Sequence, residues 1–167
     1  HLAAMAQTRA GCQEHAIRGA LEGTIFAHGM QCAYNSIITV HGEILHNEEY
    51  HHTLESTDLL LADAGAEYDG WASDVTRTWP VSGKFSPTQR AVYDIVLQSQ
   101  VEACDRVRPG ARYRDLHLGA CLTLARGLVD LGILRGSPES LVERGAHALF
   151  FPHGLGHLIG LDVHDME

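Results

Sequence analysis

The stretch DAGAEYDGWASD, residues 63–74, decides the expected fold because it begins and ends on aspartate and holds Asp69-Gly70 near its centre. The run before that dipeptide, residues 59–68, is largely apolar, and the run after it, residues 71–81, is rich in β-branched and aromatic residues. Asp-Gly between two such runs is the strongest short-range signal for a β-hairpin with a type I′ turn. The stretch therefore predicts a hairpin with an acid at each end.

The register of this hairpin predicts where the two aspartates point. With the Asp-Gly dipeptide as the loop, Gly65 faces Asp74 and Asp63 faces Thr76. Side chains alternate between faces with period two, so both aspartates share one face. As diagonal neighbours their Cβ atoms would lie within about 7–8 Å. Gly65 is expected to leave open space beside them, and a one-residue bulge would undo the arrangement.

Two carboxylates that face one hollow repel each other. Either the pKa of one carboxyl rises or a cation neutralises the pair. Two metal ions about 3.5–4 Å apart, bridged by a carboxylate, would fit such a cradle. The alternative is two solvated acids on the open face of an edge hairpin, and the hairpin alone does not separate these readings.

The histidines of HGLGHLIGLDVHD, residues 153–165, favour the metal reading. His153, His157 and His164 lie in a stretch whose glycines disfavour a helical histidine pair and predict a tight turn packed closely against other backbone. One such histidine would be interpreted as structural. Three, beside a paired-acid hairpin, indicate a carboxylate and imidazole site that suits Mn, Co, Zn or Fe better than a thiolate site would.

The composition bounds the class of protein. The 167 residues fit one domain, and 45% hydrophobic with 20% charged residues is typical of a folded globule. A net charge of −9 disfavours nucleic acid as a partner, and no apolar run approaches the roughly 20 residues of a membrane span. No signal peptide is recognisable, which predicts a cytoplasmic protein. No C-x-x-C pair occurs among the cysteines, which are expected to be reduced and mostly buried: Cys12, Cys32, Cys104 and Cys121.

Periodicity and capping signals predict the remaining elements. Ser86-Pro87-Thr88-Gln89 has the pattern of a helix N-terminus with a capping box. The tail that holds the histidines mixes strand-like and glycine-turn sequence. The further elements expected are a helix over 1–22 ending at Gly23, a strand over 36–40, the helix from Ser86 ending before Pro109, a helix over 115–131 stopped by Gly132, and a short helix from Ser137-Pro138.

Three segments together carry a family resemblance. DAGAEYDGWASDVTRTWPVSGKFSPTQRAVYDIVL (63–97), FFPHGLGHLIGLDVHD (150–165) and ITVHGEILHN (38–47) resemble the Xaa-Pro peptidases of the pita-bread metallopeptidase family, namely aminopeptidase P and prolidase. The resemblance covers most of the chain. It implies an α+β fold, in which a curved antiparallel sheet carries helices on its outer face and a dinuclear metal centre on its inner face.

The resemblance also implies a role for each site residue. The family has five metal ligands: two Asp, one His and two Glu. Asp63 matches the Asp that binds one metal, Asp74 the Asp that bridges both, and His157 the imidazole ligand. Three further histidines match positions that hold substrate or stabilise the tetrahedral intermediate: His46 for substrate binding, and His153 and His164 for catalysis.

The implied activity is hydrolysis of an X-Pro bond at a peptide N-terminus. Two divalent metal ions, most commonly Mn²⁺ with Co²⁺, Zn²⁺ or Fe²⁺ as alternatives, would polarise the scissile carbonyl and activate water, and a Glu would shuttle the proton. The expected partners are peptides with proline at the second position, without nucleic acid or membrane.

The sequence departs from the family in what it lacks. The two Glu ligands occur in segments that resemble T-V-E-P-G and R-I-E-D, and neither segment is present; Glu167 matches no ligand position. We therefore expect residues 1–167 to be part of a catalytic domain, without the family's N-terminal domain and without the last part of the catalytic domain, and to be inactive alone. An incomplete sheet would expose an apolar edge, which predicts self-association or a complementing chain.

Two other readings stay open within the fold. Prolidase, which cleaves X-Pro dipeptides, shares these motifs, and the determinants of peptide length are expected outside them. A non-catalytic pita-bread module would usually have lost metal ligands, whereas Asp63, Asp74 and His157 are all present. Methionine aminopeptidases have different hairpin and histidine motifs, and metal-free creatinase-like members are disfavoured by the same intact set of three residues.

Overall fold

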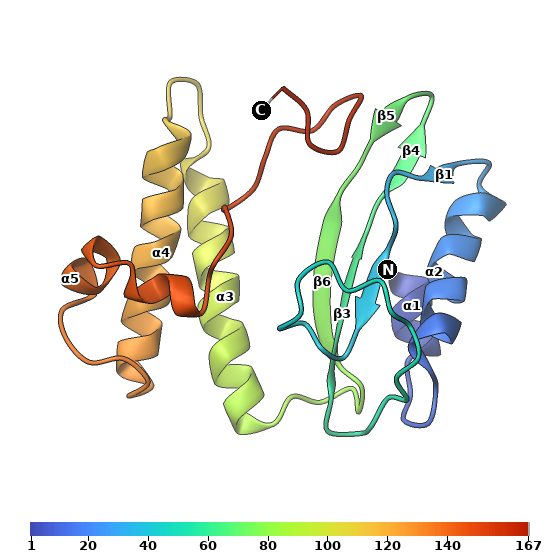
Figure 1. Cartoon of the computed structure of the whole chain (residues 1–167), viewed down its shortest axis with the longest axis horizontal. Coiled ribbons are helices and arrows are strands. Elements are labelled where there is room, and N and C mark those ends of the chain that lie inside the picture. The colour runs from blue at the N-terminus through green and yellow to red at the C-terminus, as the bar shows by residue number, and fades with distance from the viewer. Residues whose placement is uncertain (167) are drawn as a thin grey trace. The chain divides into compact units, whose positions relative to one another are not determined.

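The structure, a computed structural model, describes residues 1–166 and divides into two compact units (Figure 1). The first unit contains residues 1–85 and the residues from 157 onward, and the second contains residues 86–156. Glu167, which the sequence excluded as a ligand, lies outside the described residues. That residues 1–167 form part of one catalytic domain stays a prediction.

The first unit combines two helices with short antiparallel strands. One sheet has the order β1-β4-β5 and the other the order β2-β3-β6. Figure 1 shows both helices on one side of the strands. The elements are α1 (Leu2–Gln7), α2 (Glu14–Ala27), β1 (Gln31–Cys32), β2 (Ile37–Thr39), β3 (Leu59–Ala64), β4 (Ala66–Tyr68), β5 (Trp71–Ala72) and β6 (Val75–Pro80).

The core of this unit lies between α2 and one face of β3. Alternate residues of β3 are buried, as the period of a strand requires: Leu60, Ala62 and Ala64. The buried positions of α2 recur every four residues and present one stripe to them: Ile17, Leu21 and Ile25. Asp63 falls between the buried β3 positions and therefore points to the face away from this core.

The prediction of one continuous helix over residues 1–22 is wrong. The chain leaves the helix at Thr8 and re-enters it at Glu14, because Gly11 adopts a φ of +86° and the intervening backbone bonds to residues 50–54 instead. The helix that follows also passes through Gly23 and ends at Ala27. Hydrophobic periodicity carries no information about such long-range backbone pairing. The prediction based on it therefore gave one helix where the structure has two.

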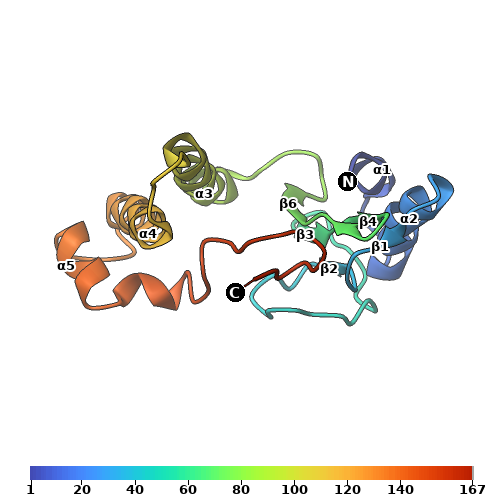
Figure 2. The same cartoon turned by 90° about the horizontal axis from the view of Figure 1, so that it is seen from above.

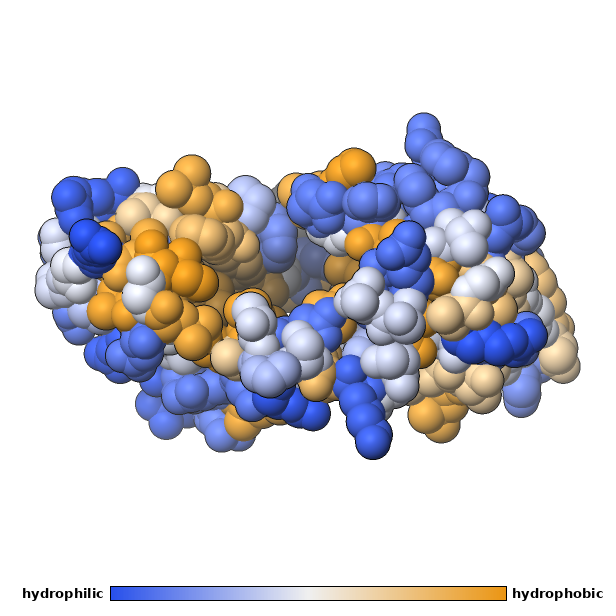
Figure 3. All heavy atoms as spheres, turned by 90° about the horizontal axis from the view of Figure 1, so that it is seen from below, coloured by the Kyte–Doolittle hydropathy of each residue, from blue (hydrophilic) through white to orange (hydrophobic). Residues whose placement is uncertain are grey.

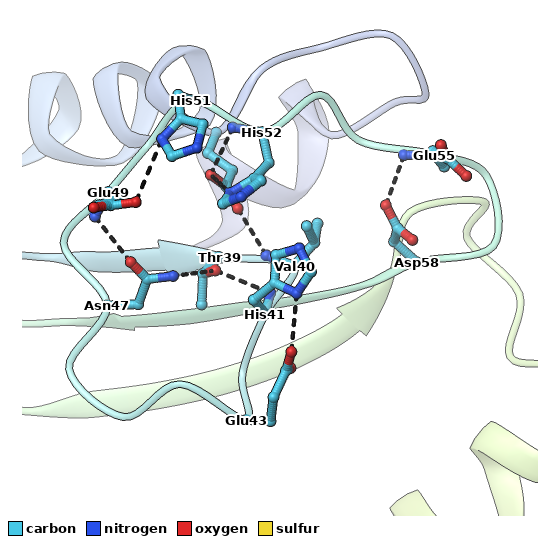
Figure 4. Close-up of polar contacts among 11 residues, drawn as sticks. Thr39, Val40, His41, Glu43, Asn47, Glu49, His51, His52, Glu55 and Asp58 are labelled. Atoms are coloured by element: carbon cyan, nitrogen blue, oxygen red, sulfur yellow. Dashed lines mark hydrogen bonds and ion pairs between the residues drawn. The ribbon is translucent and has the colours of Figure 1, made fainter.

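A histidine-rich loop, residues 41–58, is tied to α2 by one buried carboxylate (Figure 4). Glu14 is fully buried and accepts hydrogen bonds from the backbone N–H groups of Val40 and His52. The His52 ring lies 2.9 Å from the same carboxylate and stacks edge-on against His41, as Figure 4 shows for the two rings. Two histidines of this loop, His41 and His52, thus help to hold it in place.

The second unit is helical. Figure 2 shows α3 and α4 side by side, and Ile95 of α3 packs so closely on Gly127 of α4 that an added Cβ would lie 2.5 Å from the isoleucine side chain. The elements are α3 (Pro87–Arg106), α4 (Tyr113–Asp130), α5 (Pro138–Glu143) and the short 3₁₀ helix η1 (Ala146–Leu149).

The helix boundaries predicted for the second unit are confirmed within two residues. Ser86 forms the expected capping box with Gln89, and α3 ends before Pro109. Gly132 follows α4 with a φ of +72°, and Ser137 caps α5 through the backbone N–H of Ser140. The strand expected in the tail is absent from residues 151–166, where a single backbone hydrogen bond, from Ala72 to Gly160, joins the tail to a strand.

The surface carries apolar side chains in both units. Figure 3 shows them gathered on the second unit, at the left of that view. In the first unit the hairpin tip exposes Tyr68 and Trp71 by 62% and 63%. Self-association through such surfaces stays a prediction. None of the helices within residues 1–166 has both the length and the apolar character needed to cross a lipid bilayer.

We predict that Glu14→Gln destabilises the protein by about 1–3 kcal/mol, because an amide NH₂ would face backbone N–H donors and leave one of them unsatisfied. Urea denaturation would measure the loss. Glu55→Gln, in the same histidine-rich loop but exposed, is the matched control and should stay within about 0.5 kcal/mol of the parent. Equal stability of the two variants would contradict the role given to Glu14.

Candidate metal centre

The predicted hairpin register is confirmed. Asp63 pairs with Thr76, and Tyr68 pairs with Trp71. One register runs through both strand pairs, so no bulge shifts the faces. The hairpin is interrupted at Gly65, where the β2-β3-β6 sheet gives way to the β1-β4-β5 sheet.

The prediction of open space beside Gly65 is wrong. A Cβ on Gly65 would lie 1.6 Å from the carbonyl oxygen of Ser73 and 3.1 Å from a ring carbon of Tyr34. The glycine is therefore required because the opposite backbone approaches it closely, and the space beside it holds a tyrosine ring. The Ser73 N–H donates to the Ala66 carbonyl across the same point.

The two aspartates converge on that tyrosine. The Tyr34 hydroxyl, from the loop between β1 and β2, contacts Asp63 Oδ1 at short range and lies 2.8 Å from Asp74 Oδ1. All three residues are partly buried. A phenol carries one proton, so it cannot donate a full hydrogen bond to both carboxylates at once.

The electrostatics of the pair follow from burial and from like charge. Burial raises the pKa of Asp63, and the nearby charge of Asp74 raises it further against the lowering effect of the Tyr34 hydrogen bond. Burial and then the two carboxylates raise the pKa of Tyr34, which keeps its phenol protonated. Within residues 1–166, neither carboxylate forms an ion pair with Lys or Arg.

His157 completes the group. Its Nε2 lies 3.0 Å from Asp74 Oδ2, and its Nδ1 lies 2.8 Å from the Leu158 carbonyl oxygen. A neutral imidazole has one N–H and cannot donate to both acceptors. With Nδ1 as the donor, Nε2 would turn its lone pair toward the carboxylate, and a shared proton or a cation would relieve that repulsion. Two carboxylates and an imidazole are also ligands that divalent metal ions accept.

The remaining predicted site residues are placed differently. His164 is exposed, and its ring stacks on that of His157 with centroids 3.9 Å apart. His46 is exposed in the loop between β2 and β3 with a φ of +53° and makes no hydrogen bond to Asp63, Asp74 or His157 in the described part of the chain. His153 belongs to the second unit, where its ring meets that of Phe151. The roles of all three stay predictions.

Sequence reasoning missed Tyr34. It lies in a short loop with no motif around it, two residues after β1. The only available signal was indirect: pairing of residues 36–40 with the strand that holds Asp63 would bring the preceding loop beside Gly65. The structure shows that pairing, with Ile37 opposite Asp63 and the Ala33 N–H donating to the Gly65 carbonyl.

Comparison with known proteins identifies the family. The model of metallopeptidase family M24 matches residues 1–167. The chain belongs to metallopeptidase family M24. The α+β class and the pita-bread fold expected of that family are confirmed, since the chain superposes on aminopeptidase P structures with TM-scores of 0.97.

Relatives of this M24 chain include Xaa-Pro aminopeptidases. It is 41% identical to the Xaa-Pro aminopeptidase of Escherichia coli, covering 99% of the chain and 38% of the relative, and 40% identical to a probable Xaa-Pro aminopeptidase of Chaetomium globosum, covering 100% and 29%. A zinc-substituted E. coli aminopeptidase P in complex with product matches with a TM-score of 0.97 at 41% identity, covering 100% of this chain and 39% of that one. The chain thus spans about a third of the length of these relatives.

We predict that Gly65→Ala destabilises the protein by more than about 4 kcal/mol, because the new methyl group would overlap a backbone carbonyl that cannot move without breaking the hairpin. Gly23→Ala is the matched control. It lies inside α2 with nothing within 4 Å of the added Cβ, and should stabilise by about 0.5–1 kcal/mol. Denaturant midpoints would compare them, and a Gly65→Ala protein as stable as its parent would show that the hairpin tolerates a side chain there.

Proposed function

We propose that the protein containing this chain is a Xaa-Pro aminopeptidase that removes the first residue of peptides with proline at the second position. The observation that carries the proposal is the set of contacts made by Asp74, whose Oδ1 shares the Tyr34 hydroxyl with Asp63 and whose Oδ2 lies 3.0 Å from Nε2 of His157. The similarity to Xaa-Pro aminopeptidases supports the substrate class.

The donor set fits divalent cations. Asp63 and Asp74 would hold two metal ions, Asp74 as the bridging ligand, and His157 would bind one of them through Nε2. Carboxylate oxygens with one imidazole suit Mn²⁺, which we propose as the resident ion. When bound, such ions supply Lewis acidity and lower the pKa of a water molecule enough to make it a nucleophile.

The chain's own residues would orient these ligands. The Tyr34 hydroxyl holds one oxygen of each carboxylate, so both keep the rotamer that faces the shared point. The Leu158 carbonyl accepts from Nδ1 of His157, which fixes the tautomer that leaves Nε2 with a lone pair. The ring of His164 stacks on that imidazole and limits its rotation.

Three histidines are proposed to meet the substrate. We assign substrate binding to His46, and to His153 and His164 the stabilisation of charge that develops on the scissile carbonyl oxygen. Each is exposed, as a substrate contact must be before binding. The same proposal has three further parts. Residues 1–167 alone are expected to be inactive, the protein is expected to be cytoplasmic, and its substrates are expected to be peptides rather than nucleic acids.

We predict that Asp74→Asn lowers the kcat/KM of the full-length protein for an X-Pro-Y peptide by about 1000-fold or more, because loss of a bridging carboxylate removes several kcal/mol of transition-state stabilisation. Asp69→Asn, at the tip of the same hairpin, is the matched control. It has a φ of +50° in the turn, where asparagine is equally suitable, and should leave activity unchanged.

The same assay separates the alternatives. Aminopeptidase P activity requires cleavage of X-Pro-Y peptides, whereas a protein that cleaves only X-Pro dipeptides would be a prolidase. A full-length protein that binds metal but hydrolyses neither peptide would be a binding module, and the proposed function would be wrong.

We predict that Tyr34→Phe weakens binding of Mn²⁺ by about 10–100-fold, because the two carboxylates lose the hydroxyl that holds them in place. Titration calorimetry on the metal-free protein would measure this directly. Tyr68→Phe, at the exposed hairpin tip, should bind Mn²⁺ like the parent. Unchanged affinity in Tyr34→Phe would remove the tyrosine from the site.

A further inference from the structure

The second unit contains a group of metal-binding side chains that the peptidase site does not use. His117 and Cys121 lie one turn apart on the same face of α4, and His147 lies on η1. One ligand atom from each of the three residues lies within 4.8 Å of the other two. None of them was among the residues that the sequence motifs indicated.

The spacing within α4 already matches a metal site. The His117 Nε2 and the Cys121 Sγ are 3.5 Å apart. Zn–N and Zn–S bonds of about 2.1 and 2.3 Å at a tetrahedral angle place the two ligand atoms about 3.6 Å apart. The helix therefore presents the imidazole and the thiol at the separation that one zinc ion requires, and η1 needs only to bring the third ligand slightly closer.

The hydrogen bonds around the cluster are incomplete. Cys121 is fully buried, and the Nδ1 atoms of His117 and His147 are both shielded from solvent without a hydrogen-bond partner among the described residues. A thiol that donates to His117 Nε2 would account for one contact and leave both Nδ1 atoms unpaired. An ion held by His117 Nε2 and Cys121 Sγ would not satisfy the Nδ1 of His117, but it could take the lone pair of the Nδ1 of His147. Buried polar atoms are rarely left without a partner, so the unpaired Nδ1 of His147 beside this imidazole and thiol points to an ion.

The protonation states favour ligation. Burial lowers the pKa of His117, and the neighbouring His147 and His153 lower it further, so the ring is neutral and offers a lone pair. Burial raises the pKa of Cys121, so its thiol stays protonated without a metal. Binding of a cation would break the S–H bond, form an S–metal bond and release the proton to solvent.

We propose that His117, Cys121 and His147 bind one zinc ion through two imidazoles and a thiolate, with solvent as the fourth ligand. The donor set is softer than that of the paired aspartates and discriminates against Mn²⁺ and Mg²⁺. The site lies within the second unit and does not depend on the proposed peptidase activity.

The test uses Co²⁺ as a spectroscopic probe for Zn²⁺ in the full-length protein after removal of metal by a chelator. Thiolate coordination gives a sulfur-to-cobalt charge-transfer band in the near ultraviolet, which carboxylate and imidazole ligands alone do not produce. We expect this band in the parent, its displacement by Zn²⁺, and its loss in Cys121→Ser. Cys104→Ser, an exposed cysteine on α3 of the same unit, should keep the band.

Zn²⁺ affinity gives a second readout. His147→Gln should weaken Zn²⁺ binding at this site by at least about 10–100-fold, the loss typical of residues that only support a metal ligand. Circular dichroism would confirm that each variant is folded. If Cys121→Ser does not fold, His147→Gln tests the site in its place. A folded parent that gives no thiolate band with Co²⁺, or a His147→Gln protein with parental Zn²⁺ affinity, would overturn the proposal.

Discussion

Asp63 can face a cation because one antiparallel strand pair, β3 with β6, keeps its register without a bulge. The strand period sends Leu60, Ala62 and Ala64 into the core and turns the aspartate the other way. A slip of one residue would bury the carboxylate in the core and expose alanine instead. The burial that stabilises the first unit therefore also orients its chemistry.

The constraint at Gly65 acts on the same hairpin. Close approach of the Ser73 carbonyl leaves no room for a Cβ, and the Tyr34 ring fills the remaining space. The tyrosine hydroxyl then contacts both carboxylates but has only one proton to donate. A like-charged pair held together in this way is costly unless positive charge is supplied. Packing and electrostatics thus explain together why a member of a metallopeptidase family has these residues here.

Local signals predicted the hairpin, its register and the helices from Ser86 onward, because each depends on residues close in sequence: the Asp-Gly turn, a capping box and a stop glycine. The long-range features could not be predicted in this way. The break between α1 and α2 depends on backbone pairing with residues 50–54, and Tyr34 reaches Asp63 through pairing of β2 with β3. His117, Cys121 and His147 have no recognisable ligand spacing, since the third lies 26 residues after the second on another element.

Two donor sets of different hardness in one chain have a consequence for metal loading. The Irving–Williams order gives most nitrogen and oxygen sites a higher affinity for Zn²⁺ than for Mn²⁺, so the aspartate pair cannot select Mn²⁺ by affinity alone. A buried thiolate with two imidazoles binds Zn²⁺ more strongly than carboxylates with one imidazole do, because the softer ligands suit the borderline ion. With zinc in limited supply, the second unit would take it first. The paired aspartates would then be left to the harder and more abundant ions, and the metal content of the proposed peptidase site would depend on residues in the other unit of the chain.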